Sequence, residues 1–174
     1  MKINMRARTI NIPTFDELYS SAPKELKEYI NRCEDCLQSP GWHPEGNTLI
    51  HIKLVYDRAR ESGDINLALA AFFHDLGKAD TTALNAKGTW SAHGHESVSR
   101  KLAHKHAGWI EEMGGDADQV AEIVGQHMRI QQFPNMRNSK QAEMRQNRYF
   151  DKIQQFTEFD NMQTLTKDEL NRYK

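Results

Sequence analysis

The chain has 174 residues, enough for one domain with a sizeable core, and its 38% hydrophobic and 27% charged residues are typical of a soluble globular protein. Its 23 Lys and Arg residues balance 24 Asp and Glu residues, and the net charge of −1 excludes a global basic field for gripping long nucleic acid. No apolar run is long enough to cross a bilayer, and no signal peptide is visible, so we expect no membrane association and a cytoplasmic location.

The pattern of apolar residues predicts an all-α fold. We expect an irregular N-terminal arm over residues 1–22, followed by a single domain over 23–174. In chain order, helices are predicted over 23–38, 47–62, 65–75, 95–113, 116–129 and 141–160, with breaks at 63–64, 114–115 and 131–135. Residues 77–94 contain no apolar run and predict a loop at the mouth of the site, and strand signals are absent from the sequence.

Cys33 and Cys36 lie in the first predicted helix. Leu26, Ile30 and Cys33 repeat there at helical spacing, so Cys33 is interpreted as a small core residue. A zinc ribbon would need a second cysteine pair, which the sequence lacks.

The most informative feature is a His-Asp pair directly after a buried helix. Residues 65–73 read I-N-L-A-L-A-A-F-F and are apolar nearly all round, as expected for a helix inside a domain. His74 and Asp75 follow at once, and burying both side chains is costly unless they are paired or bound to metal. The plainer alternatives are a buried Asp-His hydrogen bond or a helix end that emerges into solvent.

Three more residues with metal-binding side chains lie at inward positions of other predicted helices. His51 lies beside Val55, His127 follows Val124 by three residues, and Asp160 follows Phe156 by four. Asp151 lies off that last apolar stripe, which makes Asp160 the better candidate. Imidazoles and carboxylates suit borderline divalent metals.

Four segments carry a resemblance to a known family: A-A-F-F-H-D-L-G-K (70–78), E-G-N-T-L-I-H (45–51), H-G-H-E (93–96) and Q-H-M-R (126–129). They resemble the HD-domain superfamily of metal-dependent phosphohydrolases, above all the HD domain attached to bacterial tRNA nucleotidyltransferases, over roughly residues 42–162. The family pattern of His, His-Asp and a distant Asp matches His51, His74-Asp75 and Asp160. The resemblance implies a compact helical bundle of about six helices around a metal site.

The resemblance also implies a ligand set. His51, His74, Asp75 and Asp160 would hold one divalent ion, and in members with two ions Asp75 would bridge to a second. His95 and His127 match the positions that hold this second ion, although His93 competes with His95 and could contact substrate instead. One or two ions are therefore expected, and Mn, Mg, Fe, Ni, Co and Zn all stay open.

The implied chemistry is attack on phosphorus by a metal-activated water. Asp75 and Lys78 are the expected catalytic residues, and Lys78, His93, Arg129 and Arg137 are the expected substrate-binding residues. Lys78 belongs to the His-Asp loop and Arg129 follows His127 by two residues, whereas Arg137 lies in the loop beyond.

The leading hypothesis is a phosphomonoesterase or phosphodiesterase that acts on a nucleotide, a cyclic nucleotide or an RNA-end phosphate. The chain lacks the polymerase part of tRNA nucleotidyltransferases, so tRNA end-addition is not implied. Two alternatives stay open: a di-iron oxygenase of HD type and a non-catalytic binding module stabilised by metal. The sequence predicts no bulk nucleic-acid binding and leaves the oligomeric state open.

Overall fold

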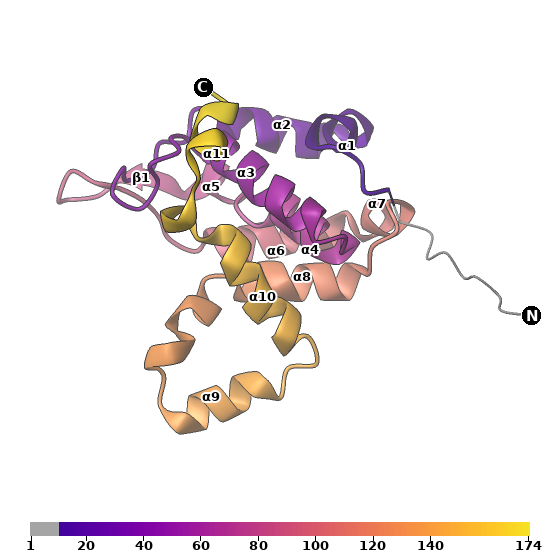
Figure 1. Cartoon of the computed structure of the whole chain (residues 1–174), viewed down its shortest axis with the longest axis vertical. Coiled ribbons are helices and arrows are strands. Elements are labelled where there is room, and N and C mark those ends of the chain that lie inside the picture. Colours follow the sequence, from indigo (N-terminus) through magenta and orange to yellow (C-terminus); the bar gives the residue numbers. More distant parts are fainter. Residues whose placement is uncertain (1–10) are drawn as a thin grey trace, which may run out of the picture.

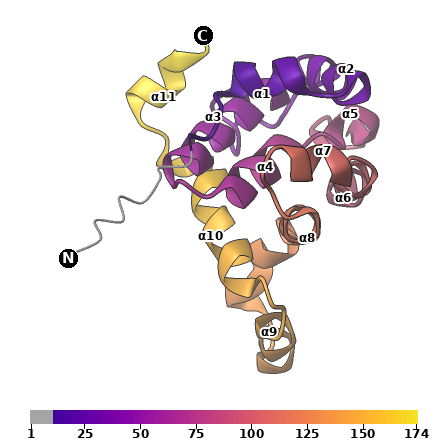
Figure 2. The same ribbon diagram turned by 90° about the vertical axis from the view of Figure 1, so that its right-hand side faces the viewer.

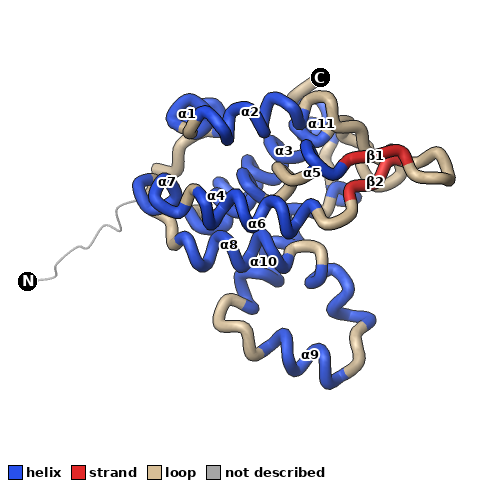
Figure 3. The backbone as a smooth tube through the Cα atoms, turned by 180° about the vertical axis from the view of Figure 1, so that it is seen from behind, coloured by secondary structure: helices blue, strands red, loops and turns tan. Residues whose placement is uncertain are grey.

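The computed structural model describes residues 11–174, and within that range it is a helical bundle with one short hairpin (Figures 1 and 3). The helices are α1 (Phe15–Ser21), α2 (Lys24–Cys33), α3 (Thr48–Glu61), α4 (Ile65–Phe73), α5 (Lys78–Thr81), α6 (His95–Lys105), α7 (Ala107–Glu112), α8 (Ala117–Gln126), α9 (Asn138–Arg145), α10 (Phe150–Asp160) and α11 (Lys167–Arg172). Two 3-10 helices, η1 (Arg129–Asn135) and η2 (Met162–Thr164), and the strands β1 (Thr82–Leu84) and β2 (Trp90–Ala92) complete the described part. The all-α prediction is confirmed, although the number of helices exceeds six.

Helix α4 is the centre of the fold. Its residues from Leu67 to Phe73 are all fully buried, and it packs against α3 on one side and α8 on another. Asp64 caps its first turn by accepting hydrogen bonds from the backbone N–H groups of Asn66 and Leu67. A helix buried on every side needs apolar residues on every side, as the sequence predicted.

The prediction of an irregular arm over residues 1–22 is wrong for residues 15–21. Residues 1–10 lie outside the residues that the structure describes. Residues 15–21 form α1, where Thr14 caps the helix by accepting from the Glu17 N–H group. Phe15 and Leu18 are buried in the common core, and the Phe15 ring packs edge-on against Tyr56. Two helical turns are too few to display a periodic pattern, which is why the sequence did not reveal them.

The predicted loop over 77–94 contains α5 and an antiparallel hairpin, contrary to the expected absence of strands. Thr82 pairs with Ala92 and Leu84 with Trp90. The Asn85 side chain shapes the turn by accepting from the N–H groups of Lys87 and Thr89. Strands of three residues are too short to display alternation, so this turn chemistry was the only available signal.

Two helices predicted as continuous are interrupted. The helix expected over 95–113 breaks at His106, whose Nε2 lies 2.9 Å from Glu25 of α2. The helix expected over 141–160 breaks before α10, where the Asn147 side chain accepts from the Tyr149 N–H group and donates to Glu122. Both breaks are stabilised by side chains from distant segments or by a local Asx turn, which apolar spacing does not encode.

Residues 129–149, which we call the projection, extend away from the bundle in every view (Figures 1 and 2). They comprise η1, α9 and the turn that leads into α10. None of the helices in the described part of the chain is long and apolar enough to cross a membrane.

Arg58 of α3 fastens the end of α10 to the bundle. Its guanidinium donates to the backbone carbonyls of Phe159 and Asn161 at 3.3 and 3.0 Å, and it pairs with Glu169 of α11 at 2.6 Å. A cation at a helix C-terminus is favourable because the last carbonyls lack helical partners. This clamp fixes the position of Asp160, which lies between those two carbonyls in sequence.

Candidate metal centre

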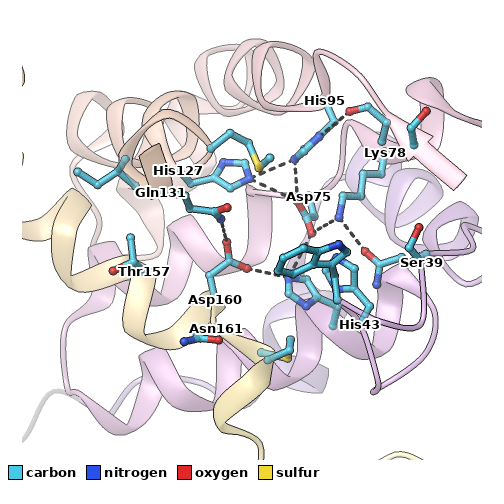
Figure 4. A pocket seen from close by; sticks show the side chains of 18 of the residues that line it. Ser39, His43, Asp75, Lys78, His95, His127, Gln131, Thr157, Asp160 and Asn161 are labelled. Carbon is cyan, nitrogen blue, oxygen red and sulfur yellow. Dashed lines mark hydrogen bonds and ion pairs between the residues drawn. The ribbon is translucent and has the colours of Figure 1, made fainter. Parts of the chain in front are cut away.

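The six sequence-predicted metal ligands lie close together, and Figure 4 shows four of them, Asp75, His95, His127 and Asp160, around the cavity. They come from five elements that are far apart in sequence: His51 from α3, His74 and Asp75 from the end of α4, His95 from the start of α6, His127 from the end of α8, and Asp160 from the end of α10. Five of the six lie at helix ends, where the backbone turns away and a polar side chain can point into a space between helices.

Four of these residues form a tight group, which we call the four-donor group. The Nε2 atom of His51 lies 2.9 Å from Asp160 Oδ1, 3.2 Å from His74 Nε2 and 3.3 Å from Asp75 Oδ2. The Nε2 atom of His74 is 3.4 Å from each of the same two carboxylate oxygens. Each of the two nitrogens thus lies within 3.4 Å of both carboxylate oxygens.

The other oxygen of Asp75 belongs to a second group, the three-donor group. Asp75 Oδ1 lies 3.0 Å from His95 Nε2 and 3.5 Å from His127 Nε2, and these two nitrogens are 3.1 Å apart. Asp75 therefore faces one group with each oxygen, as a carboxylate that bridges two ions would.

The histidine tautomers test whether the site suits a cation. The Nδ1 atoms of His74, His95 and His127 lie 2.6–2.8 Å from the backbone carbonyls of Ala71, Ala92 and Val124, which only accept, so each Nδ1 carries the proton. In the neutral imidazoles the Nε2 lone pairs then face one another at close range. Such an arrangement requires a cation or protons between the nitrogens, so the residues fit a divalent metal.

Glu45 contacts the metal centre, although the sequence analysis did not single it out. Its Oε1 accepts from His51 Nδ1 at 2.8 Å and from His43 Nδ1 at 2.9 Å. Burial raises the pKa of Glu45, but the hydrogen bonds from the two histidines more than offset this and lower it to about 2. The available signal was its position six residues before His51 in E-G-N-T-L-I-H.

The charges inside the centre are strongly coupled. Burial alone would raise the pKa of Asp75 and Asp160, but the neighbouring histidines, with Lys78 for Asp75, hold both well below the usual value. Burial lowers the pKa of His74, but the charges of Asp75 and Asp160 more than offset this and raise it to about 10. Both carboxylates are therefore charged at neutral pH and attract a cation into the centre.

Gly77 explains how α6 approaches Asp75 closely enough to place His95. A Cβ atom at this position would overlap the backbone carbonyl oxygen of His95. The Gly77 N–H group also donates to the buried Ser99 hydroxyl of α6 at 2.8 Å. The glycine of the H-D-L-G-K run is therefore a requirement of packing between α5 and α6.

The centre lies in the floor of a cavity of about 780 Å³. Lys78 lines it, and its Nζ lies 2.9 Å from Asp75 Oδ2 and 2.7 Å from Gln38 Oε1. His93 also lines the cavity and is exposed, whereas His95 is buried next to Asp75. The geometry thus separates the two histidines that the sequence left in competition.

Arg129 and Arg137 lie outside this cavity, although the sequence suggested that they bind substrate beside Lys78. Arg129 lines a separate depression and lies 3.7 Å from Glu143, and Arg137 precedes α9 on the projection. The reason is that Ile130, Gln131, Phe133 and Pro134 of η1 line the cavity in their place. Gln131 also contacts the metal centre, because its Nε2 donates to Asp160 Oδ2 at 3.2 Å.

Large apolar side chains surround the mouth of the cavity. Trp42, Trp90, Leu37 and Met128 line it and are each exposed to solvent, Trp42 by 74%. Exposed apolar side chains that gather at one opening indicate a binding site for a ligand with an apolar or aromatic part.

A helical bundle in which buried helix ends bring His and Asp donors together around a shared carboxylate is typical of one class of metal-binding α-helical domains. The family model described as HD domain matches residues 48–154, more than half of the chain, and the chain belongs to this family.

Among curated proteins, the chain is similar to the multifunctional CCA protein of Thioalkalivibrio sulfidiphilus. The two are 43% identical over 76 residues, which is 43% of this chain and 18% of the relative. The chain therefore matches a minor part of that longer protein. No solved structure matches the chain.

Proposed function

We propose that the protein is a metal-dependent phosphohydrolase that acts on a nucleotide, a cyclic nucleotide or an RNA-end phosphate. The observation that carries this proposal is the position of Asp75, whose two oxygens face two adjoining groups of donors at the floor of an open cavity. Many enzymes that catalyse displacement at phosphorus, such as phosphatases and nucleases, use two adjacent divalent ions.

The four-donor group would hold one ion and the three-donor group a second, with Asp75 shared between them through its two oxygens. When bound, the ions would supply a water of lowered pKa and withdraw charge from the phosphoryl oxygens. The three-donor group leaves more coordination positions free, so its side of the centre is where we expect substrate to enter.

The protein's own residues would bind and orient the phosphate. Lys78 lies at the cavity wall beside Asp75, and its ammonium group would hold a phosphoryl oxygen against the centre. His93 would contact the substrate from the hairpin side. Gln131 fixes Asp160 by donating to its outer oxygen, which keeps the inner oxygen turned toward His51.

Two observations support a substrate that carries a nucleobase over a phosphate compound without an aromatic part. Trp42 and Trp90 are exposed at the cavity mouth, where an indole can stack on a base. The similar protein from Thioalkalivibrio sulfidiphilus is described as a multifunctional CCA protein. Lys78 is the one Lys or Arg side chain that lines the cavity within residues 11–174, which favours a substrate with few phosphates.

The test begins with elemental analysis of the untreated protein. Each candidate ion is then restored after chelation, and nucleoside monophosphates, 2′,3′-cyclic nucleotides and a generic phosphodiester are screened for release of phosphate or alcohol. We expect hydrolysis that depends on metal and is equal in air and under nitrogen. Absence of hydrolysis with every ion would overturn the proposal, and turnover that requires oxygen would replace it with the oxygenase alternative.

A pair of variants examines the role of Lys78. Lys78→Met should weaken substrate binding or turnover by about 10-fold or more while the metal content stays unchanged, because a charged hydrogen bond to phosphate is lost. Lys87→Met, on the exposed turn of the neighbouring hairpin, is the matched control and should be neutral. Loss of metal from Lys78→Met would instead make Lys78 part of the structural support of Asp75.

A further inference from the structure

The projection differs in charge from the rest of the chain. Of the 23 Lys and Arg residues and 24 Asp and Glu residues in the chain, residues 129–149 contain 5 basic and 1 acidic. The basic residues are Arg129, Arg137, Lys140, Arg145 and Arg148, all of them exposed, and the acidic residue is Glu143. The projection thus carries a net positive charge, while the remainder of the chain is net negative.

Acidic neighbours compensate little of this positive charge. Within residues 11–174, Arg129 and Lys140 pair only with Glu143, whereas Arg145 and Arg148 have no Asp or Glu partner. Arg145 and Arg148 lie over the rings of Phe133 and Tyr149 at 5.0 and 4.9 Å. Their guanidinium groups are therefore held in place without being neutralised, which leaves them available to an anion.

The composition of the projection is also that of a surface which contacts phosphates and sugars. It contains seven amide side chains, namely Gln131, Gln132, Asn135, Asn138, Gln141, Gln146 and Asn147. Arg, Lys, Asn and Gln side chains are among the groups that contact the phosphates and sugars of nucleic acids. An acidic protein partner would give no reason for this enrichment in amides.

The projection begins at the metal centre. Gln131 contacts Asp160, and Gln131, Phe133 and Pro134 of η1 form one wall of the cavity that contains the centre. A polymer that follows the projection is thus led into the cavity, whereas a free mononucleotide would gain nothing from charges outside it.

We propose that the projection binds the phosphodiester backbone of a single-stranded polynucleotide and guides its end to the metal centre. This inference rests on the proposed phosphohydrolase function and, among the substrates proposed there, favours the phosphorylated end of a polynucleotide strand over a free nucleotide or cyclic nucleotide. It also gives a role to the basic residues of the projection, none of which lines the cavity.

The experiment measures binding of fluorescein-labelled single strands of about twelve nucleotides with a 3′-phosphate, RNA and DNA of the same sequence, by anisotropy at several salt concentrations. The test variant is Lys140→Gln/Arg145→Gln/Arg148→Gln. The control is Lys24→Gln/Lys101→Gln/Lys167→Gln, which removes the same charge from exposed positions elsewhere. Hydrolysis of a mononucleotide and metal content are measured on both variants.

We expect the test variant to bind the strand at least ~10-fold more weakly at low salt. The slope of the logarithm of the binding constant against the logarithm of the salt concentration should decrease in magnitude by about 2, because three phosphate contacts are lost. The control should bind like the unaltered protein, and both variants should keep metal content and mononucleotide hydrolysis. Tighter binding of RNA than DNA would identify RNA as the strand, and the reverse would identify DNA.

Equal binding by the test and control variants would overturn the inference, as would failure of the unaltered protein to bind either strand at low salt. Binding of polyglutamate with strand binding absent would instead assign the projection to an acidic protein. If only the phosphohydrolase proposal fails, the projection will still bind the strand, but no substrate will be hydrolysed.

Discussion

The two halves of the metal centre share Asp75 but are built differently. The four-donor group joins helices α3, α4 and α10, whose ligands are up to 109 residues apart, and a buried carboxylate, Glu45, supports its His51. In the three-donor group the Nδ1 atoms of His95 and His127 contact backbone carbonyls, Glu96 Oε2 lies 3.8 Å from His95 Nδ1, beyond hydrogen-bond distance, and His95 follows closely on the hairpin. We therefore expect the first half to retain its ion more tightly and the second half to exchange ion and substrate more readily.

The largest effect should come from the residue that the halves share. Asp75→Asn removes the negative charge that each group needs but keeps the shape of the side chain, so both ions and all hydrolysis should be lost. Elemental analysis and the phosphate-release assay measure this. Asp151→Asn, an exposed change on α10, is the control and should be neutral. Full metal content in Asp75→Asn would contradict the shared-carboxylate assignment.

The next prediction separates the two halves. His127→Ala removes a donor of the three-donor group only, so the metal content should fall from about two ions to about one, with hydrolysis lost. His51→Ala should lower the occupancy of the tighter half and leave less metal after dialysis than His127→Ala. The comparison is made on proteins dialysed side by side. If His127→Ala loses more metal than His51→Ala, the proposed order of affinities is wrong.

A smaller effect on metal binding is expected from replacing Glu45, which accepts a hydrogen bond from His51. Glu45→Gln can still accept from His51 Nδ1 but removes a buried negative charge that increases the basicity of that imidazole. Metal affinity should fall by about 10–100-fold in the four-donor half. A competition titration with a metal indicator measures this. Glu34→Gln, exposed after α2, should leave the titration unchanged, and an equal curve for Glu45→Gln would remove Glu45 from the centre.

The sequence predicted the residues of the centre better than the surroundings that position them. His51, His127 and Asp160 could be identified because each continues an apolar stripe that faces the core, and such a stripe is a local property of a helix. Glu45 and Gln131 reach the centre from non-helical or 3-10 segments, whose direction depends on distant contacts. The same reason explains why Arg129 and Arg137 were expected near Lys78: the direction of the chain after His127 is not encoded by the spacing of apolar residues.

The hairpin and the breaks at His106 and Asn147 illustrate the same limit. Each is fixed by side-chain hydrogen bonds, some to distant segments, so residue spacing within 77–94 or 141–160 could not reveal it. The all-α class was predictable because the buried helix α4 and its neighbours account for most of the core.

A separate test of the four-donor half is the dependence of metal-free stability on pH. Without an ion, the pKa of His74 is raised to about 10, from about 6.5 in an unfolded chain, because Asp75 and Asp160 outweigh the effect of burial. The folded protein then binds the extra proton more tightly than the unfolded chain. This contribution to stability is fully present below about pH 6.5 and is lost as the pH rises toward 10. The melting temperature of the chelated protein should therefore fall over this range relative to that of chelated His74→Gln, which lacks the group. The metal-loaded protein should not show this fall, because His74 as a proposed ligand would offer its Nε2 lone pair to the ion and would carry no second proton. A parallel fall in the His74→Gln variant would assign the effect to other groups and weaken the electrostatic account of the four-donor half.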